Sequence, residues 1–378
     1  MTNTADLIII GGGIAGVSLA ARIADHRRVI LLEGEDQFAY HSTGRSAAMF
    51  IRNYGPPVIR VLNRMSESFL RDHEGFSVSP LLSPRGQMTI DFGNDSEEFE
   101  AYIDGSKGLE IISADEAHQI VPILNRARLQ RAAYEPDASE IDVDMLFSSF
   151  QKKAKAAGAE LKSKQMVQAI SRQDGVWRVT TTQDVFEAPI VVNAAGAWVD
   201  HIAGLAGVNP IGITPKRRSA VMIPAPEGAM AWPMIVPAAE DWYAKPDAGQ
   251  LMISPADADP VEAHDAYPDD MVLAEGIDRF SKATTVEVTR VERSWAGLRS
   301  FAPDGDPVVG FADDAEGFFW LGGQGGYGIQ TSPALSSIAA ALLMGQSIDQ
   351  SINQSMHAEL EASLSPLRFN TAIEMQAE

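Results

Sequence analysis

The chain has 378 residues, of which 45% are hydrophobic and 21% charged, and its formal net charge is −21. Its length predicts about two domains, and its acidity disfavours nucleic acid and anionic membranes as partners. The absence of cysteine excludes disulfides, thiolate metal sites, a thiol nucleophile and a flavin attached through sulfur. Since no apolar run reaches the roughly 18 residues of a membrane span and no signal peptide is recognisable, we expect no membrane span and a cytoplasmic location.

The first predicted unit is a strand, a glycine-rich turn, a helix and a second strand. Residues 7–10 (LIII) and 29–33 (VILLE) suit strands buried on both faces, and helical periodicity lies between them. Gly11 permits the tight turn, Gly13 lets the backbone approach a pyrophosphate, and Gly16 lets the helix pack on the strand. This βαβ pattern predicts an adenine dinucleotide site.

An acid and three later segments bear on which dinucleotide binds. Glu33 lies where a carboxylate accepts hydrogen bonds from a ribose diol, which argues against NADP. Residues 41–49 (HSTGRSAAM) suit a backbone wrapped around pyrophosphate and ribityl chain, and 189–198 (PIVVNAAGAW) suit a strand reaching a cofactor at the edge of a sheet. In 317–335, a strand and a five-glycine turn lead into a helix, whose N-terminus would stabilise the anion of a reduced flavin. These segments favour FAD over NAD.

The central part of the chain predicts elements of both domains. Residues 142–157 read as an amphipathic helix ending at Gly158, and 159–193 alternate like short strands. Residues 87–91 and the span from about 211 to 300 also predict strands, which we take as a second domain.

Within that span, TTVEVTRVERSWAGL at 284–298 is one stretch with strand-like alternation, and the turn-rich segment 254–270 is expected to be a surface loop or an active-site lid. Its acidic and histidine residues match no metal-binding spacing, and no metal is expected; they are Asp257, Asp259, Glu262, His264 and Asp265.

Short sequence motifs along nearly the whole chain resemble those of one flavoprotein family. They are YHSTGRSAA at 40–48, PLLSPR at 80–85, NAAGAW at 193–198, PKRRSA at 215–220, YAKPDAG at 243–249, SPADADPVEAHD at 254–265, WAGLRSFAPDGD at 295–306, EGFFW at 316–320 and GGYGIQTS at 325–332. The chain resembles D-amino-acid oxidase-type flavoproteins, and the FAD-dependent D-arginine dehydrogenases most closely. The resemblance implies oxidation of a D-amino acid by hydride transfer from Cα to flavin N5, followed by hydrolysis to a 2-oxo acid and ammonia.

The fold class implied is α/β (α+β), with a Rossmann-like FAD-binding domain interleaved with a substrate domain on a mixed, largely antiparallel sheet. We place the discontinuous FAD-binding domain at residues 1–80, 142–212 and 301–378. The substrate-binding domain is placed at 81–141 and 213–300.

The motif and the resemblance together give a set of residues expected to bind FAD non-covalently. They are Gly11, Gly13, Ile14, Ala15, Gly16, Glu33, Gly34, Ser42, Thr43, Gly44, Arg45, Ser46, Ala47, Ala48, Val167, Ala195, Gly196, Trp198, Gly297, Gly325, Gly328, Ile329 and Gln330. Covalent attachment through His41 is conceivable but is not the expected mode.

The resemblance assigns substrate-binding roles to five residues, which are Arg218, Arg299, Tyr54, Tyr243 and Gly326. The two arginines would bind the substrate carboxylate, since a guanidinium matches a carboxylate bidentately, and Arg217 is the rival of its neighbour. The tyrosines would orient the substrate, and the glycine carbonyl would accept a hydrogen bond from the amine. No acid or base is required at carbon.

Two departures from the D-arginine dehydrogenases concern the substrate side-chain pocket. Gln87 stands where those enzymes have a glutamate, and Met49 replaces a histidine. Loss of one charge at about 4 Å removes about 1 to 4 kcal/mol of attraction, so preference for cationic substrates is expected to weaken. Glu240 and Asp241 are possible substitutes for the missing acid.

Other functions remain open at this stage. The main alternative is oxidation of another amine, as in glycine and sarcosine oxidases, or of a 2-hydroxy acid. Two less favoured alternatives are a flavin-binding sensor without catalysis and an NAD-dependent dehydrogenase. The electron acceptor, which is oxygen, a quinone or another carrier, is not encoded in recognisable residues.

Overall fold

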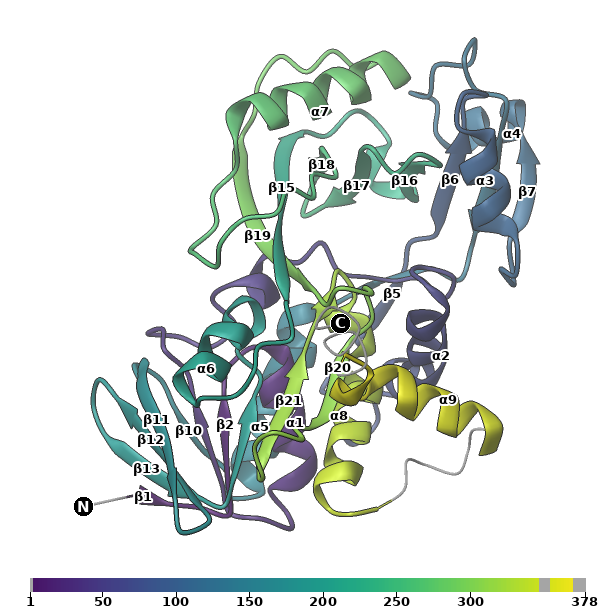
Figure 1. Ribbon diagram of the computed structural model, residues 1–378. Helices are drawn as coiled ribbons and strands as arrows, with labels where there is room; N and C mark the ends of the chain where they lie inside the picture. The colour runs from purple at the N-terminus through teal and green to yellow at the C-terminus, as the bar shows by residue number, and fades with distance from the viewer. Residues whose placement is uncertain (1–2, 347–353, 370–378) are drawn as a thin grey trace, which may run out of the picture.

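The structure is a computed structural model that describes residues 3–346 and 354–369. Figure 1 shows a lower part built around a parallel sheet and an upper part built around a second, larger sheet. Two long strands, β15 (Thr214–Pro224) and β19 (Arg293–Phe301), run between the two parts.

The parallel sheet has six strands in the order β10-β3-β2-β14-β21-β20, and only β20 is antiparallel to its neighbour. In this order they are Glu160–Lys162, Val29–Leu32, Leu7–Ile10, Ile190–Asn193, Phe318–Gly322 and Val308–Phe311. Successive residues of β2 enter different cores: Leu7 and Ile9 face one side, and Ile8 and Ile10 the other. Burial on both faces explains why this strand is a continuous apolar run.

Helices cover one face of the parallel sheet and a smaller sheet covers the other. The first face is packed by α1 (Ile14–Ile23), α5 (Val143–Ala156) and α8 (Gly328–Leu343), with α2 (Pro57–Arg71) packed on α8. The second face is covered by α6 (Val199–Leu205) and by a four-stranded sheet in the order β1-β13-β12-β11. Those strands are Asn3–Thr4, Val185–Ala188, Val176–Thr181 and Val167–Gln173.

The upper sheet has nine strands in the order β22-β19-β15-β18-β17-β16-β6-β8-β7, all antiparallel except the β16–β6 pair. Apart from β15 and β19 they are Gln324–Gly325, Gln250–Ser254, Tyr243–Asp247, Met234–Pro237, Gln87–Asp91, Arg131–Glu135 and Glu110–Ser113. On the outer face pack α4 (Ala114–Ile120) and α7 (Asp270–Ala283), whereas α3 (Ser96–Ile103) packs on the opposite face through Phe99 and Tyr102.

The remaining elements are a small sheet and short helices. A three-stranded sheet pairs β9 (Ser139–Ile141) with β4 (Met49–Phe50) and β5 (Leu82–Pro84). The helix α9 and four short 3-10 helices complete the described chain; they are Gln354–Leu364, Ser42–Arg45, Gly196–Trp198, Ala229–Ala231 and Pro366–Phe369.

The predicted fold class is confirmed, with a parallel α/β unit and a separate mixed, largely antiparallel sheet. The segments 81–141 and 213–300 supply eight of the nine upper strands, and β22 comes from the segment 301–378. The proposed domain boundaries remain a prediction, and residues 1–2, 347–353 and 370–378 of the first and third segments lie outside the described residues.

Two predictions within 211–300 were wrong. The alternating stretch 284–298 forms a strand only from Arg293, where its pairing with β15 begins. Residues 270–283 form α7 instead of a strand, and Asp269 caps this helix by accepting hydrogen bonds from the backbone amides of Met271 and Val272.

Candidate active site

Two cavities meet beneath the nine-stranded sheet. The first follows the carboxyl edge of the parallel sheet, from the glycine turn after β2 to the start of α8. The second lies between the inner face of the nine-stranded sheet, α3 and residues 46–56. Five residues line both cavities, and these are Ser46, Arg218, Arg299, Gly326 and Ile329.

The turn after β2 lines one end of the first cavity. Gly11 has a φ of 116°, and a Cβ there would lie 2.3 Å from the carbonyl oxygen of Ala194. Only glycine fits this position, which brings the turn against the end of β14. The first turn of α1 carries no acidic side chain, and Ala15 in it lines the cavity. A helix N-terminus open to a cavity suits a phosphate group.

Glu33 lies at the end of β3, also on the wall of the first cavity. Its carboxylate accepts hydrogen bonds from the backbone amides of Gly12 at 2.8 Å and Glu35 at 2.9 Å. Burial raises its pKa, although these amide bonds oppose the shift. The carboxylate is therefore held rigidly, with lone pairs remaining for a ribose diol.

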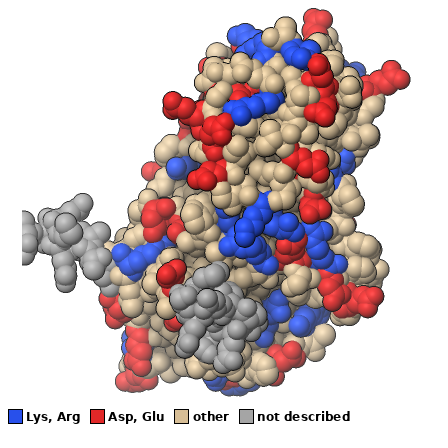
Figure 2. All heavy atoms as spheres, turned by 90° about the vertical axis from the view of Figure 1, so that its right-hand side faces the viewer, with Lys and Arg blue, Asp and Glu red and all other residues tan. Residues whose placement is uncertain are grey.

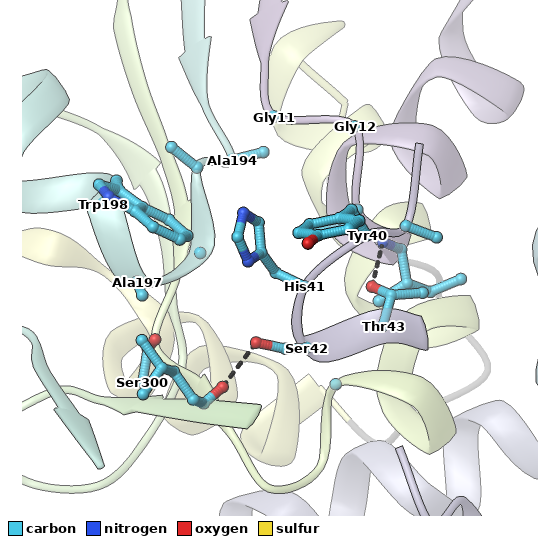
Figure 3. A pocket seen from close by; sticks show the side chains of 18 of the residues that line it. Gly11, Gly12, Tyr40, His41, Ser42, Thr43, Ala194, Ala197, Trp198 and Ser300 are labelled. Carbon is cyan, nitrogen blue, oxygen red and sulfur yellow. Dashed lines mark hydrogen bonds between the residues drawn. The ribbon is translucent and has the colours of Figure 1, made fainter. Parts of the chain in front are cut away.

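The segment 40–45 forms the side of the cavity opposite the sheet edge. Thr43 accepts a hydrogen bond from the Ile14 amide at 3.0 Å, and Ser42 donates one to the Leu298 carbonyl at 2.6 Å (Figure 3). His41 lies between Tyr40 and Trp198, with ring centroids 4.9 and 4.6 Å away. Through these two hydrogen bonds the segment connects the start of α1, next to the glycine turn, to β19 of the nine-stranded sheet.

Arg45 connects the same segment to the loop 254–270. Its guanidinium donates to the carbonyls of Ala266 and Ala296 and pairs with Asp265. At the other end of the loop, Asp257 is buried and accepts hydrogen bonds from the backbone and hydroxyl of Ser219. The loop is thus anchored beside the first cavity at both ends.

Most residues expected to bind FAD line the first cavity. They are Gly11, Gly13, Ile14, Ala15, Glu33, Gly34, Ser42, Thr43, Arg45, Ser46, Val167, Ala195, Gly196, Trp198, Gly297, Gly325, Gly328 and Ile329. Ala47, Ala48 and Gln330 instead line the second cavity. Gly16 and Gly44 line neither cavity, and their lack of a Cβ allows close contact with the carbonyls of Gly11 and Ala39.

The first cavity also contains residues that sequence reasoning did not single out as cofactor ligands, among them Gly12, Tyr40, Met166, His201 and Gln324. Gly12, Tyr40 and Gln324 lie within quoted motifs, whereas Met166 and His201 lie in none, and their place on the cavity wall follows from tertiary packing. A carboxylate, the N-terminus of α1 and the first turn of α8 all line this cavity. These features fit an extended FAD molecule.

Arg218 and Arg299 lie on the same face of the nine-stranded sheet. On adjacent strands Arg218 pairs with Gly297, and Arg299 comes two residues later, so both side chains project to the inner face. Arg217 projects to the opposite face, where it pairs with Asp257 and Asp259. Because side chains alternate along β15, Arg218 faces the cavities and Arg217 does not.

Neither Arg218 nor Arg299 has an ion pair with a carboxylate among the described residues. Arg218 donates to the backbone carbonyl of Asp257 at 2.7 Å. Burial, followed by the charge of Arg299, lowers the pKa of Arg218. Burial alone would lower the pKa of Arg299, but Tyr54 and Tyr243 raise it. Two neighbouring cations without an acidic partner form a site for an anion.

Tyrosines surround this pair of cations. Tyr54 and Tyr243 line the second cavity with the arginines and Gly326. Burial would raise the pKa of Tyr243, but the charges of Arg299 and Arg218 lower it overall. Tyr327 packs on Tyr54 with ring centroids 5.0 Å apart, and burial raises its pKa. Sequence reasoning had not selected this last tyrosine, although it lies within the GGYGIQTS motif.

Gly326 sits directly against one of the arginines. A Cβ at this position would lie 2.8 Å from Nη1 of Arg299, so glycine leaves room for the guanidinium. The five predicted substrate-binding residues are therefore brought together on the wall of one cavity. Their individual roles remain predictions.

Gln87 and Met49 line the second cavity as well. The Gln87 side-chain amide donates to Thr89 at 3.2 Å and to the Tyr102 hydroxyl at 3.1 Å. The Tyr102 hydroxyl in turn lies 3.4 Å from the buried carboxylate of Glu135, which also accepts a hydrogen bond from Asn53. This polar network fixes the orientation of Gln87.

Glu240 lines the same cavity and is exposed, whereas Asp241, the second possible substitute for the missing acid, does not line it. Within residues 3–346 and 354–369, no helix combines the length and apolar character needed to cross a bilayer.

Known proteins resemble this chain in sequence and in fold. Glycine oxidase of Geobacillus kaustophilus is 23% identical over 363 residues, covering 91% of this chain and 94% of that protein. Mitochondrial dimethylglycine dehydrogenase of Mus musculus is 27% identical over 226 residues, covering 55% of this chain but 25% of that protein, so the match spans a quarter of the relative's length. The crystal structure of L-proline dehydrogenase from P. horikoshii superposes with a TM-score of 0.82 at 22% identity, covering 98% of this chain and 99% of the other.

None of the three is a D-arginine dehydrogenase, and that narrower resemblance remains a prediction. A family model described as "FAD dependent oxidoreductase" (DAO) matches residues 6–342. The chain belongs to this family, and FAD is its cofactor.

Proposed function

We propose that this protein oxidises the Cα–N bond of an amino acid that carries a free carboxylate. The observation that supports this most strongly is the pair Arg218 and Arg299, two cations without a carboxylate partner among the described residues, on the wall shared by both cavities. Bound FAD would supply the two-electron acceptor for the hydride that leaves Cα.

In this proposal the protein's own residues position the substrate. The arginines bind its carboxylate bidentately, and Tyr54 and Tyr243 restrict its rotation. The carbonyl of Gly326 accepts a hydrogen bond from the amine, which directs the Cα hydrogen toward the first cavity. Hydride loss yields an imine, and water then releases a 2-oxo acid and the amine. No base is needed to remove a proton from carbon.

Two classes of amine are candidates for the substrate. The family resemblance favours a primary D-amino acid, giving ammonia. The named relatives favour the alternative, since a glycine oxidase and a dimethylglycine dehydrogenase act by name on glycine-type or N-substituted amines. We therefore give glycine-type and secondary amines the greater weight. The second cavity, of about 460 Å³, leaves space for a substrate larger than glycine.

Product analysis tests these alternatives. The holoenzyme with an artificial electron acceptor is incubated with D- and L-amino acids, glycine, sarcosine, N,N-dimethylglycine and 2-hydroxy acids. Ammonia from D-isomers alone would support D-amino acid oxidation, and an alkylamine formed together with a 2-oxo acid would support oxidation of a secondary amine at Cα. Turnover of 2-hydroxy acids alone would contradict the proposal.

A further inference from the structure

Arg60, on the first turns of α2, lines the second cavity together with the proposed substrate-binding residues. Its Nε donates to the carbonyl of Gly55 at 2.9 Å, and its Nη1 donates to the Ser106 hydroxyl at 3.3 Å. Both acceptors are neutral, and Arg60 has no ion pair among the described residues. Since a guanidinium has five N–H donors, several remain for a ligand.

The local backbone holds this guanidinium in place. Gly55 adopts a φ of 90°, and a Cβ there would lie 2.8 Å from Ile59 and 3.0 Å from the Tyr327 ring. The Ser106 hydroxyl donates to the Tyr102 carbonyl at 2.6 Å, which ties it to α3. Arg60 is thus oriented by α2 and α3 without being neutralised.

These contacts place Arg60 at the end of the cavity formed by Gln87 and Tyr102. Ser106 links Arg60 to Tyr102, whose hydroxyl accepts a hydrogen bond from Gln87. The charge of Arg60 acts on the Tyr102 hydroxyl, opposing the rise in its pKa that burial causes. The cavity therefore has cations at two places: Arg218 and Arg299 near the first cavity, and Arg60 near the side-chain pocket.

Two acids line the same cavity as Arg60. Glu98 and Glu240 line the cavity but are exposed, and neither pairs with Arg60 in the described part of the chain. In this acidic chain, Figure 2 shows Lys and Arg side chains concentrated at mid-height of the face on which α2 lies, and α2 itself also carries Arg64 and Arg71.

We propose that Arg60 binds a second anionic group of the substrate, so that the preferred substrate is an amino acid with a second carboxylate. This inference rests on the proposed oxidation of an amino acid. It extends the expectation that cationic preference is weakened: Gln87 removes the negative charge from the pocket, and Arg60 supplies a positive one. The first carboxylate binds Arg218 and Arg299, and the second binds the free N–H groups of Arg60.

The test compares matched substrates that differ in one charge. Anaerobic flavin reduction and kcat/KM are measured with glutamate against glutamine, as D- and L-forms, and with iminodiacetate against sarcosine. The wild-type holoenzyme is expected to prefer the dicarboxylate of each reactive pair. In Arg60→Gln, kcat/KM for the dicarboxylate should fall about 10- to 100-fold, because a charge-assisted hydrogen bond is lost, while the neutral partner changes by less than about threefold.

Three further variants complete the test. Arg64→Gln removes an exposed cation of the same helix that does not line the cavity, and should leave both rates unchanged. Arg60→Lys keeps the charge and should retain part of the preference, even if Arg60→Gln folds poorly. Glu98→Gln should leave the dicarboxylate preference intact or increase it.

Two results would overturn the inference while leaving the proposed function standing. One is a wild-type preference for the neutral member of each pair. The other is an equal loss for both members of each pair in Arg60→Gln, which would indicate a structural role. If no amine reduces the flavin, the proposed function itself fails, and the inference fails with it.

Discussion

At the scale of single residues, substrate binding in the proposed function depends on Arg218 and Arg299. Both line the two cavities and neither pairs with an acid among the described residues. Replacement of Arg299 by Lys keeps a charge but loses the bidentate fork, and we expect kcat/KM to fall about 10- to 100-fold, as for loss of a charge-assisted hydrogen bond. Arg217→Lys is the matched control, since Arg217 pairs with Asp257 and Asp259 on the other face. An equal fall in kcat/KM in both variants would contradict the assignment of Arg299 to the substrate carboxylate.

Tyr243 should titrate unusually. The charges of Arg299 and Arg218 outweigh burial and lower the pKa of its hydroxyl, so tyrosinate should form below the ordinary pH of about 10. The ultraviolet difference between wild type and Tyr243→Phe measures this group alone. A bound substrate carboxylate should neutralise the arginines and raise the pKa again. A difference titration at or above pH 10 in the free enzyme would contradict the electrostatic description.

Residue-level prediction from sequence was uneven for physical reasons. The Gly11–Gly13–Gly16 spacing carries its own chemical explanation, and a motif such as GLRSF marks Arg299. Arg60 carries no comparable local signal, because it is an ordinary helix cation, and Tyr327 was not selected although it lies within the GGYGIQTS motif. Their place on the cavity wall follows from how α2, α3 and α8 pack, which one sequence does not reveal.

At the scale of elements, the turn between β22 and α8 positions the arginine site. Gly326 leaves space that a methyl group would take from Nη1 of Arg299. We expect Gly326→Ala to reduce kcat/KM at least about tenfold through displacement of this guanidinium, while FAD stays bound. Gly204→Ala is the control, because a Cβ there meets nothing within 4 Å. Flavin absorbance and steady-state kinetics of the two variants make the comparison, and unchanged activity in Gly326→Ala would refute the role of the turn.

The β6–β8 pair supplies a stability test. Asp91 is buried and accepts hydrogen bonds from Arg131 at 2.9 Å and from the Gly93 amide at 2.7 Å. Although burial opposes its charge, these bonds lower its pKa. The stabilisation is therefore present above the unfolded pKa of about 3.9 and is lost as pH falls through the lower folded value.

Asp91→Asn should cost about 2 to 3 kcal/mol of unfolding free energy near neutral pH, and the difference should shrink in acid. Denaturant unfolding at several pH values measures it. Asp115→Asn, at an exposed pair with Arg126, should change stability little. A pH-independent difference for Asp91→Asn would contradict the assigned ionisation.

Element prediction succeeded where burial leaves a strong pattern. The run at 7–10 is apolar because both faces of β2 are covered, and α5 begins at its Asp142 cap, which accepts a hydrogen bond from the Met145 amide. It failed for 284–292, where alternation occurs without a partner strand, and for α7, which follows a turn-rich loop. Pairing partners far apart in sequence decide such cases.

At the scale of the whole molecule, the first cavity runs between the two parts of the fold, so FAD should stabilise both. Ligand at about 100 times its Kd adds about 2.7 kcal/mol to a state that alone binds it. Removal of FAD should therefore lower Tm, and added FAD should restore it. Differential scanning fluorimetry of apo- and holoprotein measures this shift, and an unchanged Tm would argue against a cofactor held between the two sheets.

The central claim is that a carboxylate held by Arg218 and Arg299 presents an amino acid Cα–N bond for oxidation. Its most direct test is an anaerobic absorbance titration of the holoenzyme with primary and secondary amino acids. We expect the flavin band to bleach with one class of amino acid, with the matching amine that lacks a carboxylate inert and with Arg299→Lys strongly slowed. Bleaching by the amine without a carboxylate, or by 2-hydroxy acids alone, would contradict the account.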